Sequence, residues 1–117
     1  MEKMIINGKS YVLEEEMQPA VKDDMRFCII RTYSAGVHIG YLAEQNGKEV
    51  TLLDSRRLWK WAGAFTLSEM SRVGVTKPED CRFSCTIPEI TLTEAIEIIP
   101  CSEAARKSLT EVRAYEC

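Results

Sequence analysis

Residues 37–54 read VHIGYLAEQNGKEVTLLD, and this stretch decides the fold because it predicts a β-hairpin. Two β-prone runs lie on either side of Asn46-Gly47. An Asn-Gly pair between such runs is the strongest short-range signal for a hairpin, since both residues tolerate the positive φ angles of a tight turn. The sequence therefore predicts two antiparallel strands joined across Asn46 and Gly47.

Further β-prone segments lie on both sides of this hairpin. RFCIIRTYS (26–34) precedes it, and RRLWKW (56–61) follows it with alternating bulky and basic residues. CRFSCTI (81–87) and EITLTEAIEII (89–99) predict two more strands. In the second segment, four apolar residues have even numbers and would lie on the same face of a strand: Ile90, Leu92, Ile96 and Ile98. This is the pattern of a strand with two different faces.

Two segments have helical signals. TLSEMSRV (66–73) begins with Thr66, a residue type that caps helices well, and continues with apolar residues at helical spacing. Ser102 caps a second predicted helix over roughly 103–113, whose buried stripe is Ala105, Leu109 and Val112. The predicted fold class is α+β: a mainly antiparallel β-sheet core with a short middle helix and a C-terminal helix.

Length and composition indicate one ordinary domain. No repeat or linker divides the 117 residues, so we expect a single domain over 1–117, with residues 1–25 as an N-terminal arm or hairpin. A net charge of −3 argues against a DNA or RNA polymer as partner, because polymer binding requires a basic surplus. Neither a membrane-spanning run of ~20 apolar residues nor a signal-peptide core occurs, which favours a cytosolic protein without a membrane partner.

Signals for catalysis or metal binding are weak. The single histidine, His38, lies in an apolar-leaning strand with no nucleophile elbow, phosphate loop or HExxH motif in the chain. A lone strand histidine is more often a packed or surface residue than a catalytic one. The five cysteines are an odd number at irregular spacing, which indicates free thiols and not a structural zinc site. We therefore expect no enzyme, no metal and no cofactor.

The hexapeptide RRLWKW is the most unusual part of the chain. On a strand, Arg57, Trp59 and Trp61 share one face, while Arg56 is on the other. An arginine beside two indoles suits a nucleotide, because the guanidinium binds phosphate and the indole stacks on a base. The tryptophans can equally anchor the core while the cations stay in solvent. The spacing does not separate these two interpretations.

Several phrases together resemble one protein family. The resemblance covers the chain from about Phe27 to Ser108, and we place the core of the family at residues 26–117. The matching phrases are RTYSAGVHIG (31–40), GKEV (47–50), RRLWKWAGAFTLSEM (56–70) and ITLTEAIEIIPCSEAA (90–105). These phrases are similar to a family of short phage proteins that includes the Thoeris anti-defence 1 proteins. Those are phage sponges that sequester cyclic ADP-ribose signals made by bacterial TIR-domain enzymes. Some members also capture cyclic oligonucleotide signals of CBASS immunity.

This resemblance implies a site and an assembly. It implies a homodimer or an oligomer of dimers that holds the uncleaved cyclic nucleotide between protomers, in the host bacterial cytoplasm. It implies phosphate contacts from Arg31 and Arg57, an adenine platform at Phe83, and Arg106 on the other face of the base. Thr93 would supply a polar contact where some relatives have an amide side chain.

Two other functions remain as alternatives. An enzyme that degrades such a signal needs a metal cluster or a base–nucleophile pair, which a single histidine makes improbable. A phage structural or host-protein-binding module would use Trp59 and Trp61 as interface anchors. The sequence therefore favours a nucleotide sponge, with the interaction module as the alternative.

Overall fold

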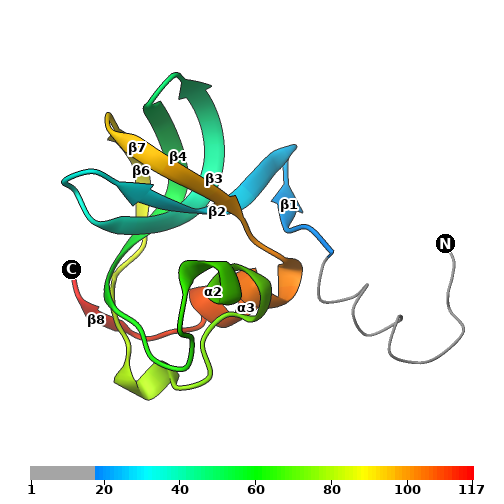
Figure 1. Cartoon of the computed structure of the whole chain (residues 1–117), viewed down its shortest axis with the longest axis vertical. Helices are drawn as coiled ribbons and strands as arrows, with labels where there is room; N and C mark the ends of the chain where they lie inside the picture. Colours follow the sequence, from blue (N-terminus) through cyan, green and yellow to red (C-terminus); the bar gives the residue numbers. More distant parts are fainter. Residues whose placement is uncertain (1–17) are drawn as a thin grey trace, which may run out of the picture.

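The structure is a computed structural model that describes residues 18–117. Most of the predicted N-terminal arm or hairpin therefore lies outside the described residues. Both helices and the sheet are seen in Figure 1, so the α+β class is confirmed. In chain order the elements are β1 (Val21–Lys22), β2 (Met25–Thr32), β3 (Val37–Asn46), β4 (Glu49–Lys60), α2 (Leu67–Val73), the 3-10 turn η1 (Pro78–Asp80), β5 (Arg82–Ser84), β6 (Ile87–Leu92), β7 (Ala95–Pro100), α3 (Glu103–Thr110) and β8 (Ala114–Glu116).

Strands β3 and β4 form the predicted hairpin. They pair antiparallel, and the last pair before the turn is Asn46 with Glu49. The two central turn residues are therefore Gly47 and Lys48, one position later than predicted, and Gly47 has a φ of 63°. Gly47 has no Cβ and adopts the left-handed conformation without strain, which is enough to close this turn. Asn46 therefore stays in the strand.

Strand β4 continues from the hairpin through RRLWKW as a single element. Its register against β3 shifts, because Ile39 pairs with Arg56 whereas Tyr41 pairs with Leu53. Strand β4 thus has one extra residue at this point, where Asp54 adopts a φ of 51°. Such a bulge bends a strand and increases its twist, which helps the sheet to curl.

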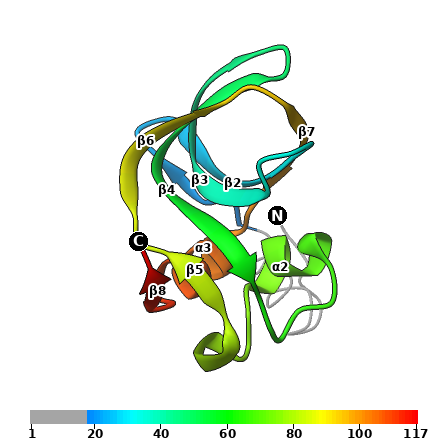
Figure 2. The same cartoon turned by 90° about the vertical axis from the view of Figure 1, so that its left-hand side faces the viewer.

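The predicted single strand over 89–99 is wrong, because the chain turns at Thr93 and Glu94 to give β6 and β7. Strand β6 pairs with β4, and β7 pairs with β2 at the other end of the β2–β3–β4 sheet. This bent segment therefore curls the sheet around on itself, as Figure 2 shows. The apolar alternation has the same parity on both sides of the turn, so the pattern did not reveal it.

The sheet is mixed, so the prediction of a mainly antiparallel sheet is confirmed only in part. Strand β5 pairs antiparallel with β4, but β8 pairs in parallel with β5. The sequence pattern did not predict β8, because all three of its residues are exposed and none alternates with a buried neighbour. Strand β8 nevertheless brings the C-terminus beside β5, which shapes the candidate site.

Both helices begin at the predicted caps. Thr66 Oγ1 accepts a hydrogen bond from Glu69 N at 3.0 Å, and Ser102 Oγ accepts one from Ala105 N at 3.1 Å. Helix α3 ends at Thr110, slightly before the predicted end. No helix in the described part of the chain is long and apolar enough to cross a membrane.

The core has two parts, one on each face of the sheet. Side chains between the sheet and the helices form the larger cluster, which includes Phe27, Ile29, Ile39, Leu58, Met70, Phe83, Ala105, Leu109 and Val112. Residues within the curl of the sheet form the smaller cluster, Cys28, Ile30, Val50, Leu52, Leu92 and Ala95. The predicted stripe of α3 is therefore buried, as expected.

Candidate functional site

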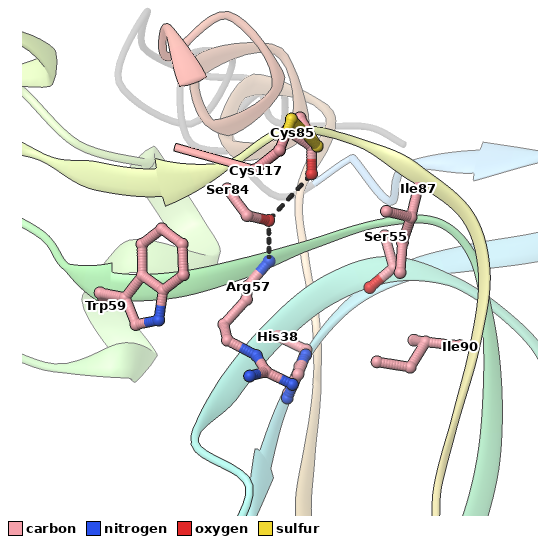
Figure 3. A pocket seen from close by; sticks show the side chains of 9 residues that line it. All are labelled: His38, Ser55, Arg57, Trp59, Ser84, Cys85, Ile87, Ile90 and Cys117. Carbon is pink, nitrogen blue, oxygen red and sulfur yellow. Dashed lines mark hydrogen bonds between the residues drawn. A yellow bond between two sulfur atoms is a disulfide. The ribbon is translucent and has the colours of Figure 1, made fainter. Parts of the chain in front are cut away.

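A pocket of about 250 Å³ lies where β3, β4, β5, β6 and the C-terminal residue meet (Figure 3). We call it the Arg57 pocket. Its walls contain polar, aromatic and aliphatic side chains from segments far apart in the sequence: His38, Ser55, Arg57, Trp59, Ser84, Cys85, Ile87, Ile90 and Cys117. Ser55, Arg57 and Trp59 alternate along β4, so the period of a strand places all three on the pocket side.

Arg57 is held by its backbone and leaves its side chain available. Its N–H donates to Ser84 Oγ at 2.7 Å, and that hydroxyl donates in turn to the Cys85 carbonyl oxygen at 2.8 Å. Within residues 18–117 the Arg57 guanidinium has no hydrogen bond or ion pair. Its forked donors are therefore free to bind an anion such as phosphate.

Two buried polar groups lie beside this cation. His38 is 1% exposed, and its Nε2 lies 2.9 Å from the Ala35 carbonyl oxygen, so Nε2 carries the proton and Nδ1 is an acceptor. Burial lowers the pKa of His38, the positive charge of Arg57 adds to this effect, and the hydrogen bond to Ala35 opposes it. The hydroxyl of Ser55, also 1% exposed, has no hydrogen-bond partner among the described residues.

An aromatic side chain borders the pocket. Trp59 is 46% exposed, an unusual exposure for a large indole. The Tyr115 ring of β8 meets it edge-on, with 6.5 Å between the ring centroids. Arg82 lies over the other ring of this pair, 4.9 Å from the Tyr115 centroid. The outer part of the pocket thus offers an aromatic surface next to the free guanidinium of Arg57.

Of the predicted site residues, the Arg57 pocket contains only Arg57. Arg31 lies on β2, where its Nε donates to Glu97 Oε1 at 2.9 Å in an exposed ion pair. Thr93 lies in the turn between β6 and β7. Arg106 lies on α3 and pairs with Glu103 at 2.6 Å. One chain therefore does not bring these residues together.

The position of Phe83 gives no support to its predicted role. Its side chain is 0% exposed and belongs to the core cluster under the helices. A ring that is packed on all sides offers no open face to an adenine, so its burial argues against Phe83 as the platform. Strand β5 directs Phe83 inwards and Ser84 towards the Arg57 pocket, as expected for neighbours on a strand.

The cysteine prediction is also partly wrong. Cys28, Cys81 and Cys101 are free and buried, as predicted, but Cys85 and Cys117 form a disulfide. The parallel pairing of β8 with β5 places the two Cα atoms 5.0 Å apart, within the range for a disulfide. A separation of 32 residues gave no local signal for this pair.

The two tryptophans of RRLWKW have different surroundings. Trp59 borders the Arg57 pocket, whereas Trp61, after the end of β4, is half-buried against the core and borders a separate shallow groove. Ser55 was missed because a serine in a strand carries no functional signal by itself. The sequence nevertheless shows that Ser55 is two residues before Arg57 and four before Trp59, so that all three share one face of a strand.

Comparison with known proteins gives one match. A family model described as a domain of unknown function, DUF6948, matches residues 25–109. The match extends from the start of β2 to Leu109, one residue before the end of α3, and includes every residue of the Arg57 pocket except Cys117. No curated protein and no solved structure matches the chain.

Proposed function

The chain belongs to the DUF6948 family, and we propose that it binds a small phosphate-bearing aromatic ligand, without cleaving it, in the Arg57 pocket. The observation that carries this proposal is the free guanidinium of Arg57 in a pocket with the exposed Trp59 indole. Phosphate and a nucleobase are the chemical groups that this pair suits.

Each pocket residue has a role in this proposal. Arg57 donates two hydrogen bonds to a phosphate, and a charge-assisted bond of this kind contributes roughly 1.5–3 kcal/mol. Trp59 stacks on the base, which is worth roughly 1–3 kcal/mol. The buried Ser55 hydroxyl and His38 Nδ1 have unused hydrogen-bonding capacity, so they select a ligand with polar groups on the side that enters the pocket.

Binding without cleavage agrees with the position of His38. A general base exchanges protons with the reacting group, and its pKa is best near the working pH. The pKa of His38 is lowered by burial, and its Nε2 is committed to the Ala35 carbonyl oxygen. A protein that only sequesters its ligand requires affinity and no proton transfer, so His38 serves as a fixed acceptor.

The resemblance to phage anti-defence proteins supplies the biological part of the proposal. In this proposal, the ligand is a cyclic nucleotide that acts as an immune signal. It is either a cyclic ADP-ribose made by TIR enzymes or a cyclic oligonucleotide of CBASS immunity. The protein acts as a sponge in the host bacterial cytoplasm, assembled as a homodimer or an oligomer of dimers. The positions of Arg31, Thr93 and Arg106 away from the Arg57 pocket give no support to a single shared site within one chain.

One surface favours the alternative, a host-protein-binding or structural module. Phe65 is 96% exposed and borders the shallow groove that also contains Trp61 and Leu67. Exposed aromatic side chains beside apolar grooves are frequent anchors in protein interfaces. This surface does not include the Arg57 pocket, so the two functions can be tested separately.

A capture-and-release experiment tests the proposed function. The protein is mixed with cyclic ADP-ribose in a buffer that contains a dithiol, separated from free nucleotide, and denatured by heat. Mass spectrometry then identifies the released molecule. We expect intact cyclic ADP-ribose from the parent protein and much less of it from Arg57→Ala. An altered product would indicate an enzyme, and the absence of capture would favour the interaction module.

A further inference from the structure

The C-terminal segment reaches the Arg57 pocket through Cys117, which lines one side of it. We call residues 114–117 the C-terminal strap: β8 followed by Cys117, whose disulfide to Cys85 is in the pocket wall (Figure 3). The strap lies beside β5 with Ala114 opposite Phe83 and Glu116 opposite Ser84. Because Cys117 is part of the pocket wall and β8 pairs with β5, a shift of the strap would change how open the pocket is.

Few interactions besides the disulfide hold the strap. Every strap residue is exposed, including Tyr115 at 57%, so β8 buries little apolar surface. Within residues 18–117, Tyr115 of the strap makes ring contacts with Trp59 and Arg82, and both lie at the surface. Besides the backbone pairing of β8 with β5, the Cys85–Cys117 bond is therefore the main tether of a weakly packed segment.

The tethered strap also limits the pocket. The volume of about 250 Å³ is below the roughly 300–1,000 Å³ typical of pockets for drug-sized ligands. The Tyr115 ring also lies against Trp59, the aromatic side chain that the proposed ligand uses, with 6.5 Å between the ring centroids. Release of the strap would remove the Cys117 side of the wall and uncover more of the indole.

We propose that the Cys85–Cys117 disulfide is a redox switch that closes the Arg57 pocket, and that its reduction releases the C-terminal strap and opens the pocket to nucleotide. This inference rests on the proposed function, since it concerns regulation of the same site. A bacterial cytoplasm keeps most thiols reduced, so the open form is the working form there. Oxidative conditions then lower the capacity of the protein for its ligand.

The chemistry is ordinary thiol–disulfide exchange with a dithiol as reductant. A thiolate of the dithiol attacks Sγ of Cys117, the more exposed of the two residues, and Cys85 leaves as a thiolate that takes up a proton. The second thiol of the reductant then displaces Cys117 from the mixed disulfide. Two protein thiols and one oxidised dithiol result, so two electrons pass from the dithiol to the protein. A small disulfide oxidant reverses the reaction.

The other three cysteines do not compete in this exchange. Burial raises the pKa of Cys28 to about 11 and that of Cys101 to about 12, so both remain thiols near neutral pH. Burial also raises the pKa of Cys81, which is 8% exposed. Reactive cysteines are accessible and readily ionised, so mild reagents act on Cys85 and Cys117 first.

Two measurements on the full chain test the switch. Titration with cyclic ADP-ribose compares the oxidised protein with the protein in a dithiol, and hydrogen–deuterium exchange follows the amides of residues 114–117 without ligand. We expect reduction to tighten binding about 10-fold, close to the effect of one freed aromatic contact. Reduction should also abolish the protection of the strap. The double variant Cys85→Ser/Cys117→Ser is the control: its affinity should be the same with and without dithiol.

The outcomes separate the switch from the proposed function. Equal or weaker binding after reduction would overturn the switch, even if Arg57→Ala still weakens binding and the function stands. A strap that keeps its protection after reduction would also overturn the switch. If neither redox form binds cyclic ADP-ribose, the proposed function fails for this ligand, and the exchange of residues 114–117 alone decides whether the disulfide holds the strap.

Discussion

The guanidinium carbon of Arg56 lies 5.2 Å from the centroid of the Phe83 ring, so these two residues form a cation–π pair inside the protein. Arg56 is 4% exposed, and it donates from Nε to the Ser84 carbonyl oxygen at 2.7 Å and from Nη1 to the Leu109 carbonyl oxygen at 3.0 Å. These contacts join β4, β5 and α3. The neighbouring Arg57 points the other way, into the pocket, so the two arginines have separate roles.

Phe83→Ala should destabilise the protein by about 3–5 kcal/mol, because it removes a fully buried ring and leaves a cavity. Urea unfolding followed by circular dichroism measures this change. Phe83→Leu keeps most of the volume and should cost less than about 1.5 kcal/mol. If Phe83→Ala retained the stability of the parent and lost only nucleotide binding, Phe83 would be the stacking platform after all.

Arg56→Met should cost about 2–4 kcal/mol of unfolding free energy, since it leaves the Ser84 and Leu109 carbonyl oxygens without their donor. Arg57→Met is the matched control one residue further along β4. Its guanidinium has no partner in residues 18–117, so this change should stay within about 0.5 kcal/mol. If the two variants lost equal unfolding free energy, the assignment of Arg56 to the interior and Arg57 to the pocket would be refuted.

Stability should fall as the pH drops below the ordinary pKa of histidine, 6.5, because the pKa of His38 is lowered in the folded protein. Between the lowered folded value and 6.5 the unfolded chain binds more protons, so acid favours unfolding, while above 6.5 His38 contributes no pH dependence. Unfolding curves at a series of pH values measure this slope. His38→Gln should flatten the curve just below 6.5, and an unchanged slope in that variant would assign the effect to other groups.

Gly47→Ala should cost about 1–2 kcal/mol, because Gly47 has a φ of 63° and a Cβ is strained in this left-handed region. Lys48→Ala is the control, since the Lys48 contact with Ala95 uses the backbone carbonyl oxygen and survives the change. Thermal unfolding of both variants checks the position of the turn. A larger loss for Lys48→Ala than for Gly47→Ala would show that the turn is centred elsewhere.

The parts of the fold that the sequence predicted depend on local signals. The Asn46-Gly47 pair indicated the hairpin, and Thr66 and Ser102 indicated the starts of the two helices. Each signal acts through hydrogen bonds or backbone angles within a few residues. The turn at Thr93 and Glu94 was missed because it depends on which strands lie nearby, and the apolar pattern continues across it.

The candidate site was predictable only in part, for the same reason. Arg57 and Trp59 share a strand face in the sequence, and both border the pocket. The identical side chain of Arg56 gave no sign that it is buried, because burial depends on β5 and α3 packing over it. The approach of Cys117 to Cys85 similarly depends on the pairing of β8, a strand without an apolar pattern.

Titration of Arg57→Ala and Arg31→Ala with cyclic ADP-ribose, under reducing conditions, tests the proposed pocket most directly. Arg57→Ala should weaken binding by about 10- to 100-fold, and Arg57→Lys should recover only part of this loss because lysine has no two-donor fork. Arg31→Ala removes the same charge, but Arg31 already forms an ion pair with Glu97. This variant should therefore bind the nucleotide as the parent does. Full affinity in Arg57→Ala, or an equal loss in Arg31→Ala, would contradict a ligand site centred on Arg57.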